Sequence, residues 1–148
     1  MTDAGLATYA AKDHYKRTRP FVFYKEDTCA PKDEAALRND GSYPSGHTSI
    51  GWMWAQVLTQ VAPDHADPLL ARGRSYGESR LVCNAHWQSD ILAGRTIASG
   101  TFAKLQSNAT YQADVAAATQ EEQSMPASAK APGVGCDGEG AGRAIPND

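Results

Sequence analysis

The chain is organised around eight consecutive residues, Gly41-Ser42-Tyr43-Pro44-Ser45-Gly46-His47-Thr48. They combine a turn, a helix start and a histidine. Pro44 restricts the residue before it to extended backbone, and Ser45 is of the type preferred at a helix N-cap. Because the first backbone N–H groups of a helix have no partner within the helix, we expect this stretch to bind an anion.

The residues that follow have the spacing of an amphipathic helix. Apolar side chains recur at i, i+3, i+4, i+7, i+8 and i+11, namely at Ile50, Met53, Trp54, Val57, Leu58 and Val61. Pro63 ends this helix. Three further helices are predicted. The first covers about residues 67 to 80 or 83, the second begins near residue 86, and the third covers residues 111–122.

The residues before the central stretch are also predicted to be partly helical. Residues 3–17 are rich in alanine and other good helix formers, and Arg19-Pro20 ends that helix. The apolar segment Phe21–Tyr24 is expected to be extended, and residues 25–40 are polar and typical of a loop. Residues 125–148 shift to Gly, Pro and Ala, which predicts a flexible tail. Strand signals are almost absent, so the predicted fold class is all-α.

The size and charge of the chain limit the classes of function that it can have. A chain of 148 residues fits one folded domain, and a net charge of −3 gives no reason to expect nucleic-acid binding. No apolar run reaches the roughly 20 residues that a membrane helix needs, and the N-terminus carries no signal sequence. Cys29, Cys83 and Cys136 leave at least one cysteine unpaired. A Cys29–Cys83 bridge and buried thiols both remain open.

Three separated motifs contain the residues best suited to chemistry. They are Lys12 with Arg19-Pro20, then Pro44-Ser45-Gly46-His47, and then Ser79-Arg80 with His86 and Asp90. Together they closely resemble the three-part signature of the type 2 phosphatidic acid phosphatase (PAP2) superfamily, which includes bacterial class A nonspecific acid phosphatases and vanadium haloperoxidases. The longer matches look most like the class A acid phosphatases. The resemblance covers about residues 8–106.

This resemblance implies a PAP2-like helical bundle and metal-free hydrolysis of small phosphomonoesters through a phosphohistidine. It implies that phosphate oxygens are bound by Lys12, Arg19 and Arg80, with Ser45 and the Gly46 N–H beside them. The residue types agree with these roles, because phosphoryl transfer requires mainly positioning and positive charge around the equatorial oxygens. Gly46, which has no Cβ, lets an anion approach the backbone.

The resemblance also assigns the catalytic roles. His86 is the expected nucleophile, Asp90 its orienting partner, and His47 the general acid. Asp90 follows His86 by four residues, so a carboxylate on the same helix face can accept from Nδ1–H and leave Nε2 free to attack. A surface pair and a zinc site are the alternatives, but His14 and His65 have no ligand-like neighbours. We therefore expect no metal and no cofactor.

The two histidines must have opposite protonation states. His86 must be neutral to attack, whereas His47 must be protonated to donate. Free histidine titrates near 6.5, so we expect a bell-shaped pH profile centred below neutrality.

The N-terminus departs from the family pattern. Family members carry a secretion signal and helices ahead of the lysine motif, whereas Lys12 stands almost at the start here. The resemblance therefore implies a catalytic helical domain over residues 1–124 that lacks the family's N-terminal helices. Apolar side chains such as Ile50, Trp54 and Val57 are then expected to be exposed and to favour homo-oligomers. A periplasmic or secreted location is implied as well.

Three functions follow from these observations. The first is an acid phosphatase whose partners are small phosphomonoesters or inorganic phosphate, with no membrane partner. The others are an inactive or weakly active phosphate-binding fragment and a vanadate-dependent haloperoxidase. Vanadate is expected to inhibit a phosphatase and to activate a haloperoxidase.

Asn84 stands where the family pattern commonly has Gly, and Asn is the next-best residue for left-handed backbone at a helix end.

Overall fold

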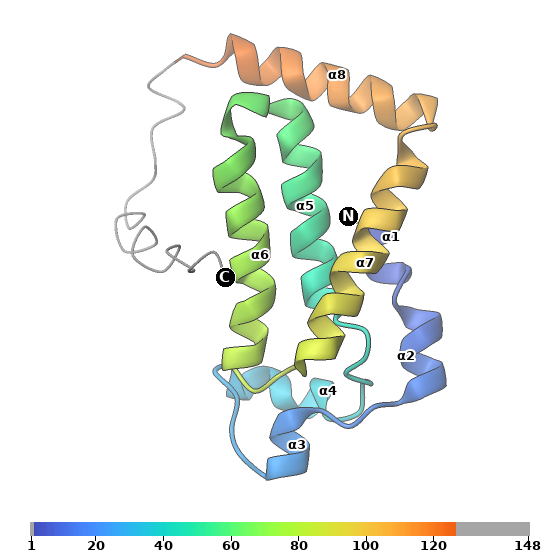
Figure 1. Cartoon of the computed structure of the whole chain (residues 1–148), viewed down its shortest axis with the longest axis vertical. Helices are drawn as coiled ribbons and strands as arrows, with labels where there is room; N and C mark the ends of the chain where they lie inside the picture. Colours follow the sequence, from blue (N-terminus) through green and yellow to red (C-terminus); the bar gives the residue numbers. More distant parts are fainter. Residues whose placement is uncertain (1, 127–148) are drawn as a thin grey trace.

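Every regular element that the structure, a computed structural model, describes within residues 2–126 is a helix (Figure 1). Three long helices stand side by side, namely α5 (Gly46–Val61), α6 (Ala66–Val82) and α7 (Gln88–Leu105). Helix α8 (Ala109–Ser124) crosses one end of these three helices. The predicted all-α fold class is therefore confirmed.

Short helices complete the fold. The turn η2 (Pro63–His65) links α5 to α6 at the end near α8. Helix α1 (Thr2–Leu6) packs against α5 and α7. Toward the end away from α8 lie the remaining short elements, which are α2 (Tyr9–Tyr15), α3 (Pro20–Tyr24), η1 (Pro31–Asp33) and α4 (Glu34–Leu37).

Helix α5 is the central element, because it packs against α1, α6, α7 and α8. It begins at the predicted cap, since Ser45 has extended backbone and its Oγ accepts a hydrogen bond of 3.1 Å from the Thr48 N–H. A small apolar core lies beside α5 and contains Ala4, Met53 and Ala98, packed with Trp52, Val57, Phe102 and Leu105. The helix therefore carries the central sequence motif at one end and most core contacts along its length.

Glycines let α6 and α7 approach α5 closely. A Cβ on Gly73 of α6 would lie 2.5 Å from the Ala55 Cβ. A Cβ on Gly94 of α7 would lie 2.6 Å from the Ser45 carbonyl oxygen, so any side chain there would push the two helices apart. This close packing at Gly94 brings the start of α7 against the start of α5.

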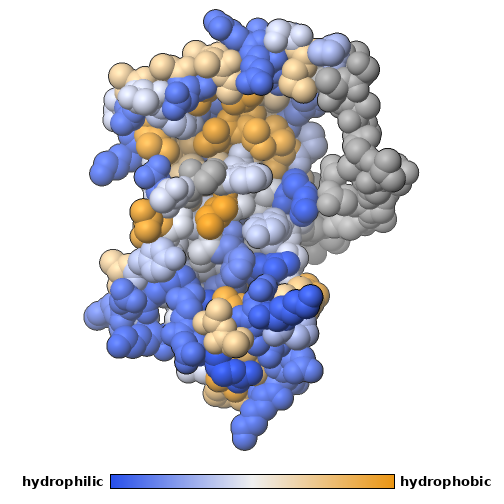
Figure 2. All heavy atoms as spheres, turned by 180° about the vertical axis from the view of Figure 1, so that it is seen from behind, coloured by the Kyte–Doolittle hydropathy of each residue, from blue (hydrophilic) through white to orange (hydrophobic). Residues whose placement is uncertain are grey.

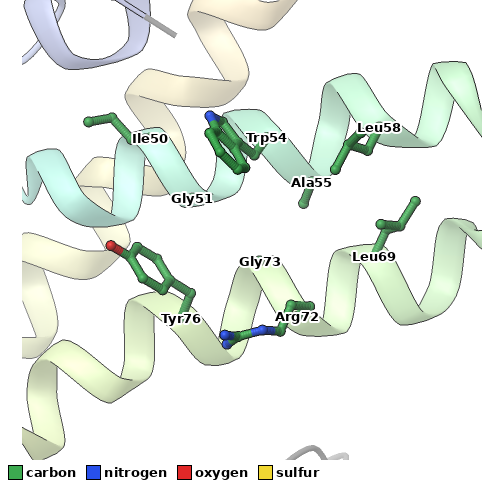
Figure 3. Close-up of a pocket in the computed structure, with 9 residues that line it drawn as sticks. All are labelled: Ile50, Gly51, Trp54, Ala55, Leu58, Leu69, Arg72, Gly73 and Tyr76. Carbon is green, nitrogen blue, oxygen red and sulfur yellow. The ribbon is translucent and has the colours of Figure 1, made fainter. Parts of the chain in front are cut away.

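An open apolar groove of about 360 Å³ runs between α5 and α6 (Figure 3). It is lined by residues of these two helices, namely Ile50, Gly51, Trp54, Ala55, Leu58, Leu69, Arg72, Gly73 and Tyr76. Ile50 and Trp54 are 38% and 54% exposed, as predicted, whereas Val57 packs against the core instead. Figure 2, seen from behind Figure 1, shows hydrophobic side chains gathered just below α8.

The N-terminal segment differs from the prediction. The helix expected over residues 3–17 is interrupted between α1 and α2, where the Thr8 hydroxyl donates to the Gly5 carbonyl at 2.7 Å and competes with the helical backbone. The segment Phe21–Tyr24, expected to be extended, belongs to α3, because Pro20 is pre-organised for the first turn of a helix. The following segment, expected to be a loop, contains η1 and α4.

The turn between α6 and α7 is tied to the segment around α3. Cys83 forms a disulfide with Cys29, which decides between the two alternatives for these cysteines. The Phe21 N–H donates to the Asn84 carbonyl at 3.0 Å. Asn84 has a φ of 60°, the left-handed backbone expected of Asn at this position. These contacts hold the first and third sequence motifs together.

Two further expectations concern the membrane and the C-terminal residues. No helix within residues 2–126 is both long and apolar enough to cross a membrane. Helix α8 ends at Ser124. The tail predicted over residues 125–148 lies outside the described residues, apart from its first two.

Candidate active site

The three sequence motifs meet around one cavity at the start of α5. The cavity has a volume of about 180 Å³ and is lined by Gly5, Thr8, Tyr9, Lys12, Arg19, Asp40, Gly46, His47 and Ile50. Four predicted site residues are therefore on its wall. His86 joins them from the turn between α6 and α7, because it contacts both Arg19 and His47.

His86 is completely buried and has a defined tautomer. Its Nδ1 lies 3.4 Å from Asp90 Oδ2, and its Nε2 lies 3.2 Å from Arg19 Nη1. Because an ionised carboxylate only accepts and a guanidinium only donates, the ring proton is on Nδ1 and the Nε2 lone pair faces Arg19. Burial lowers the pKa of His86 more than its hydrogen bond with Asp90 raises it. The ring is thus neutral, as a nucleophile requires.

Asp90 is held in place from two further directions. It is completely buried in the first turn of α7, and its Oδ2 also accepts from the Trp87 N–H at 2.9 Å. Its other oxygen, Oδ1, pairs with Arg17 Nη1 at 2.8 Å. Burial alone would raise the pKa of Asp90, but the hydrogen bonds from His86 and Trp87 and the charge of Arg17 hold that pKa below its ordinary value. Asp90 is therefore ionised and oriented toward His86.

His47 lies in the first turn of α5 and faces His86. Its Nδ1 is 3.3 Å from His86 Nε2, and the two ring centroids are 5.5 Å apart. Burial is the first cause that lowers the pKa of His47, to about 4, followed by its electrostatic interaction with His86 and with the cations Arg80, Arg19 and Lys12. Free histidine titrates near 6.5, so His47 is neutral over most of the range in which we expected it to be protonated. A phosphate dianion beside it would raise that pKa.

Lys12 and Arg19 are the buried cations of the site, with side chains 6% and 2% exposed. Both pair with the same oxygen, Asp40 Oδ2, at 3.1 Å from Lys12 Nζ and 2.9 Å from Arg19 Nη2. Burial lowers the pKa of each cation, and Asp40 opposes that effect. The cavity wall therefore carries two cations that share one carboxylate.

Two residues predicted to bind phosphate lie outside the cavity lining. Arg80, near the end of α6, donates from Nε and Nη2 to Ser79 Oγ at 3.1 and 3.0 Å, and it stacks over the Tyr76 ring. Its charge nevertheless reaches His47 and contributes to the lowered pKa there. Ser45 is completely buried and its Oγ accepts from both the N–H and the hydroxyl of Thr48. The structure therefore gives Ser45 a capping role.

Gly46 lines the cavity without being required by the packing of the protein. A Cβ on Gly46 would lie 3.6 Å from Thr8 Oγ1 and 3.8 Å from Lys12 Cε, which are ordinary contact distances. The protein leaves room for a methyl group there. Both neighbours belong to the cavity wall, so that methyl group would take up space next to the two cations.

Two site residues, Arg17 and Asp40, were not predicted from the sequence. Arg17 lies inside the first motif, and its guanidinium is also over the Trp87 ring at 5.3 Å from the centroid. Asp40 directly precedes the central stretch. The local cluster of basic residues at 12–19 was a signal for Arg17, whereas only the contacts identify Asp40.

The cavity suits a small oxyanion. Its wall carries two buried cations and His47, and His86 lies behind this wall in contact with Arg19 and His47. Residues 2–126 contain no group of three or more His, Cys, Asp or Glu side chains that could hold a metal ion. The arrangement therefore offers charge, a nucleophile and a second histidine within contact of each other.

The chain is similar to one known protein family and to several curated proteins. The PAP2 superfamily model matches residues 1–112. A non-specific acid phosphatase of Providencia stuartii is 50% identical over 122 residues, which are 82% of this chain and 49% of that protein. A non-specific acid phosphatase of Salmonella typhi is 49% identical over 115 residues, which are 78% of this chain and 46% of that protein.

A third relative is more distant but has a similar extent. An acid phosphatase of Zymomonas mobilis is 45% identical over 122 residues, or 82% of this chain and 46% of that protein. The chain spans about half the length of the curated relatives that it matches. With its helical fold and the three motifs gathered at one cavity, the chain belongs to the PAP2 superfamily.

Proposed function

We propose that this chain is an acid phosphatase that hydrolyses small phosphomonoesters through a phosphohistidine on His86, without a metal ion. The observation that carries the proposal is the position of the His86 Nε2 lone pair, which faces Arg19 Nη1 at 3.2 Å and His47 Nδ1 at 3.3 Å. Asp90 lies behind the ring and fixes its tautomer. The similarity to two non-specific acid phosphatases supports the same activity.

In the first step, His86 Nε2 attacks phosphorus and the bond between phosphorus and the alcohol oxygen breaks. Charge that develops on the imidazole is stabilised by Asp90, which accepts the Nδ1 proton in a hydrogen bond. His47 donates a proton to the leaving alkoxide, a contribution of typically about 10² to 10⁴ in rate. The negative charge of the substrate raises the pKa of His47 and so favours the protonated form that donates.

In the second step, water attacks phosphorus and the N–P bond breaks. His47, which lost its proton in the first step, accepts one from this water. Phosphate then leaves, and both histidines return to their starting states. Lys12, Arg19 and Arg80 supply the positive charge around the equatorial oxygens, so the reaction has charge stabilisation without a metal ion.

The site and the disulfide support two related proposals. Vanadate resembles the transferred phosphoryl group in charge and geometry, so it is expected to inhibit at the phosphate site. The Cys29–Cys83 disulfide favours an oxidising compartment, which supports a periplasmic or secreted location.

The test is the hydrolysis of a chromogenic aryl phosphate in the presence of EDTA. Turnover that survives EDTA is expected, with an acidic pH optimum. His86→Ala should lower turnover by at least about 10³-fold, because removing the nucleophile disables the whole catalytic unit. The matched control is His65→Ala, since His65 is exposed in η2, between α5 and α6 at the far end.

Three outcomes would change the assignment. Full activity in His86→Ala would refute the phosphohistidine mechanism. Loss of activity in EDTA that returns with added metal would refute metal independence. Halide oxidation that depends on vanadate would favour a haloperoxidase, and thermal stabilisation by phosphate without any turnover would favour a phosphate-binding fragment.

A further inference from the structure

Arg19 has no N–H group to spare for a substrate. Its Nε donates to the carbonyls of Leu37 and Asp40 at 2.9 and 3.0 Å. Its Nη1 donates to the Ala85 carbonyl at 3.0 Å and faces His86 Nε2. Its Nη2 donates to Asp40 Oδ2 at 2.9 Å and, weakly, to the Gly41 carbonyl at 3.5 Å. A new acceptor can reach this guanidinium only by replacing one of these partners.

Lys12 is engaged by the same segment. Its Nζ donates to Asp40 Oδ2 at 3.1 Å and makes a second hydrogen bond to the Gly41 carbonyl. The carbonyl partners of Lys12 and Arg19 belong to the main chain around α4 and the central stretch, so they are fixed by the fold. Among residues 2–126, Asp40 is the carboxylate that forms an ion pair with both cations.

The Asp40 side chain is also the partner that can move. It is 42% exposed, whereas Lys12 and Arg19 are almost completely buried. The Asp40 backbone is held separately, since its N–H donates to the Leu37 carbonyl and its own carbonyl accepts from Arg19 Nε. The carboxylate can therefore turn toward solvent without disturbing the main chain around it.

We propose that Asp40 is an internal anion that the phosphoryl group of the substrate displaces from Lys12 and Arg19. This inference rests on the proposed function, because it takes the two cations as the phosphate site. The carboxylate neutralises two buried charges that would otherwise be costly to keep unpaired. A phosphoryl group carries more negative charge and more oxygens than the Asp40 carboxylate, so it can accept hydrogen bonds from the same donors in its place. Asp40 thereby sets how tightly phosphate binds and selects dianions over weaker anions.

The consequence is a measurable competition. Asp40→Asn keeps the shape of the side chain but removes the charge that competes with phosphate. Inorganic phosphate should then bind about tenfold more tightly, because the two cations no longer have to exchange one anion for another. The KM for an aryl phosphate should fall by a similar factor, because the substrate competes with the same carboxylate.

The experiment compares phosphate binding to the full chain, Asp40→Asn and a control, Asp33→Asn, by titration calorimetry. Asp33 is an exposed carboxylate in the neighbouring turn η1, and its neutralisation should leave affinity unchanged. Asp40→Ala removes the same carboxylate and is the second variant if Asp40→Asn does not fold. A crystal structure with bound phosphate should show the Asp40 carboxylate out of hydrogen-bonding distance of Lys12 Nζ.

Equal or weaker phosphate binding by both Asp40 variants would overturn the inference, as would a phosphate complex in which the Lys12–Asp40 contact persists. A gain of the same size in Asp33→Asn would also overturn it, because the effect would then come from general charge. Failure of the unmodified chain and all variants to bind phosphate would instead overturn the proposed function, and this inference with it.

Discussion

Replacing His47 by glutamine should remove much of the pH dependence of folding stability below neutrality. In the folded protein the pKa of His47 is lowered to about 4, chiefly by burial, whereas an unfolded histidine titrates near 6.5. Between these two values the unfolded chain binds more protons than the folded one. Uncharged His47 therefore contributes to folding stability at pH 7. This contribution is lost progressively as the pH falls from about 6.5 to about 4, between the pKa values of the unfolded and folded states.

The size of the effect follows from the same two values. The full difference corresponds to about 3 kcal/mol, of which about 2 kcal/mol should be lost between roughly pH 7 and pH 4.5. Urea denaturation at both pH values should show this loss in the unmodified protein and a loss smaller by about that amount in His47→Gln. His65→Gln, a change at an exposed histidine, is the control and should behave like the unmodified protein. Equal losses in the unmodified protein and His47→Gln would refute the buried neutral state of His47.

Three further predictions concern the support of the site. Gly46→Ala should leave the thermal unfolding temperature within a few degrees but weaken phosphate binding by about tenfold or more, because the methyl group enters the cavity and not the core; unchanged affinity would contradict this. Arg17→Ala should lower kcat by about tenfold or more by releasing Asp90, with partial recovery in Arg17→Lys and no change in KM. Replacing Cys29 and Cys83 by serine should cost about 2 to 4 kcal/mol in urea denaturation, and no loss would refute a structural role.

The parts of the fold that could be predicted depend on local signals. Helix α5 has a capping serine, a long apolar period and a proline just after its end, and all three act within a few residues. The four-residue run Phe21–Tyr24 has no such signal, because a short apolar run fits a strand or a buried helical turn equally well. The break at Thr8 depends on a hydroxyl that could equally have faced solvent.

Site residues could be predicted when they belong to a sequence motif. They could not be predicted when their role depends on a contact between residues far apart in the sequence. Lys12, Arg19 and His86 stand at the spacings that identify the family, and the structure brings them together. Asp40 contacts Lys12 across 28 positions, and Arg17 contacts Asp90 across 73. Such contacts are set by how α2, α4 and α7 pack, which no local pattern of charge encodes.

The lowered pKa of His47 has the same origin. The sequence shows a histidine at a helix start, for which a value near 6.5 is the natural expectation. Its actual surroundings, a buried position beside His86 and several cations, arise only when the three motifs converge. Proton donation by His47 therefore depends on the charge of the bound substrate, which raises the pKa of this histidine. This dependence is a second reason, beside the ordinary pKa of histidine, to expect an acidic pH optimum.

The most direct test of the catalytic proposal is to trap the covalent intermediate. The protein is mixed with an aryl phosphate, quenched rapidly in alkali, digested and examined by mass spectrometry. We predict one added phosphoryl group on the peptide that contains His86, stable in alkali, released by acid and absent from His86→Ala. Phosphorylation of Ser45 instead, or turnover with no modified peptide at any quench time, would contradict attack by His86.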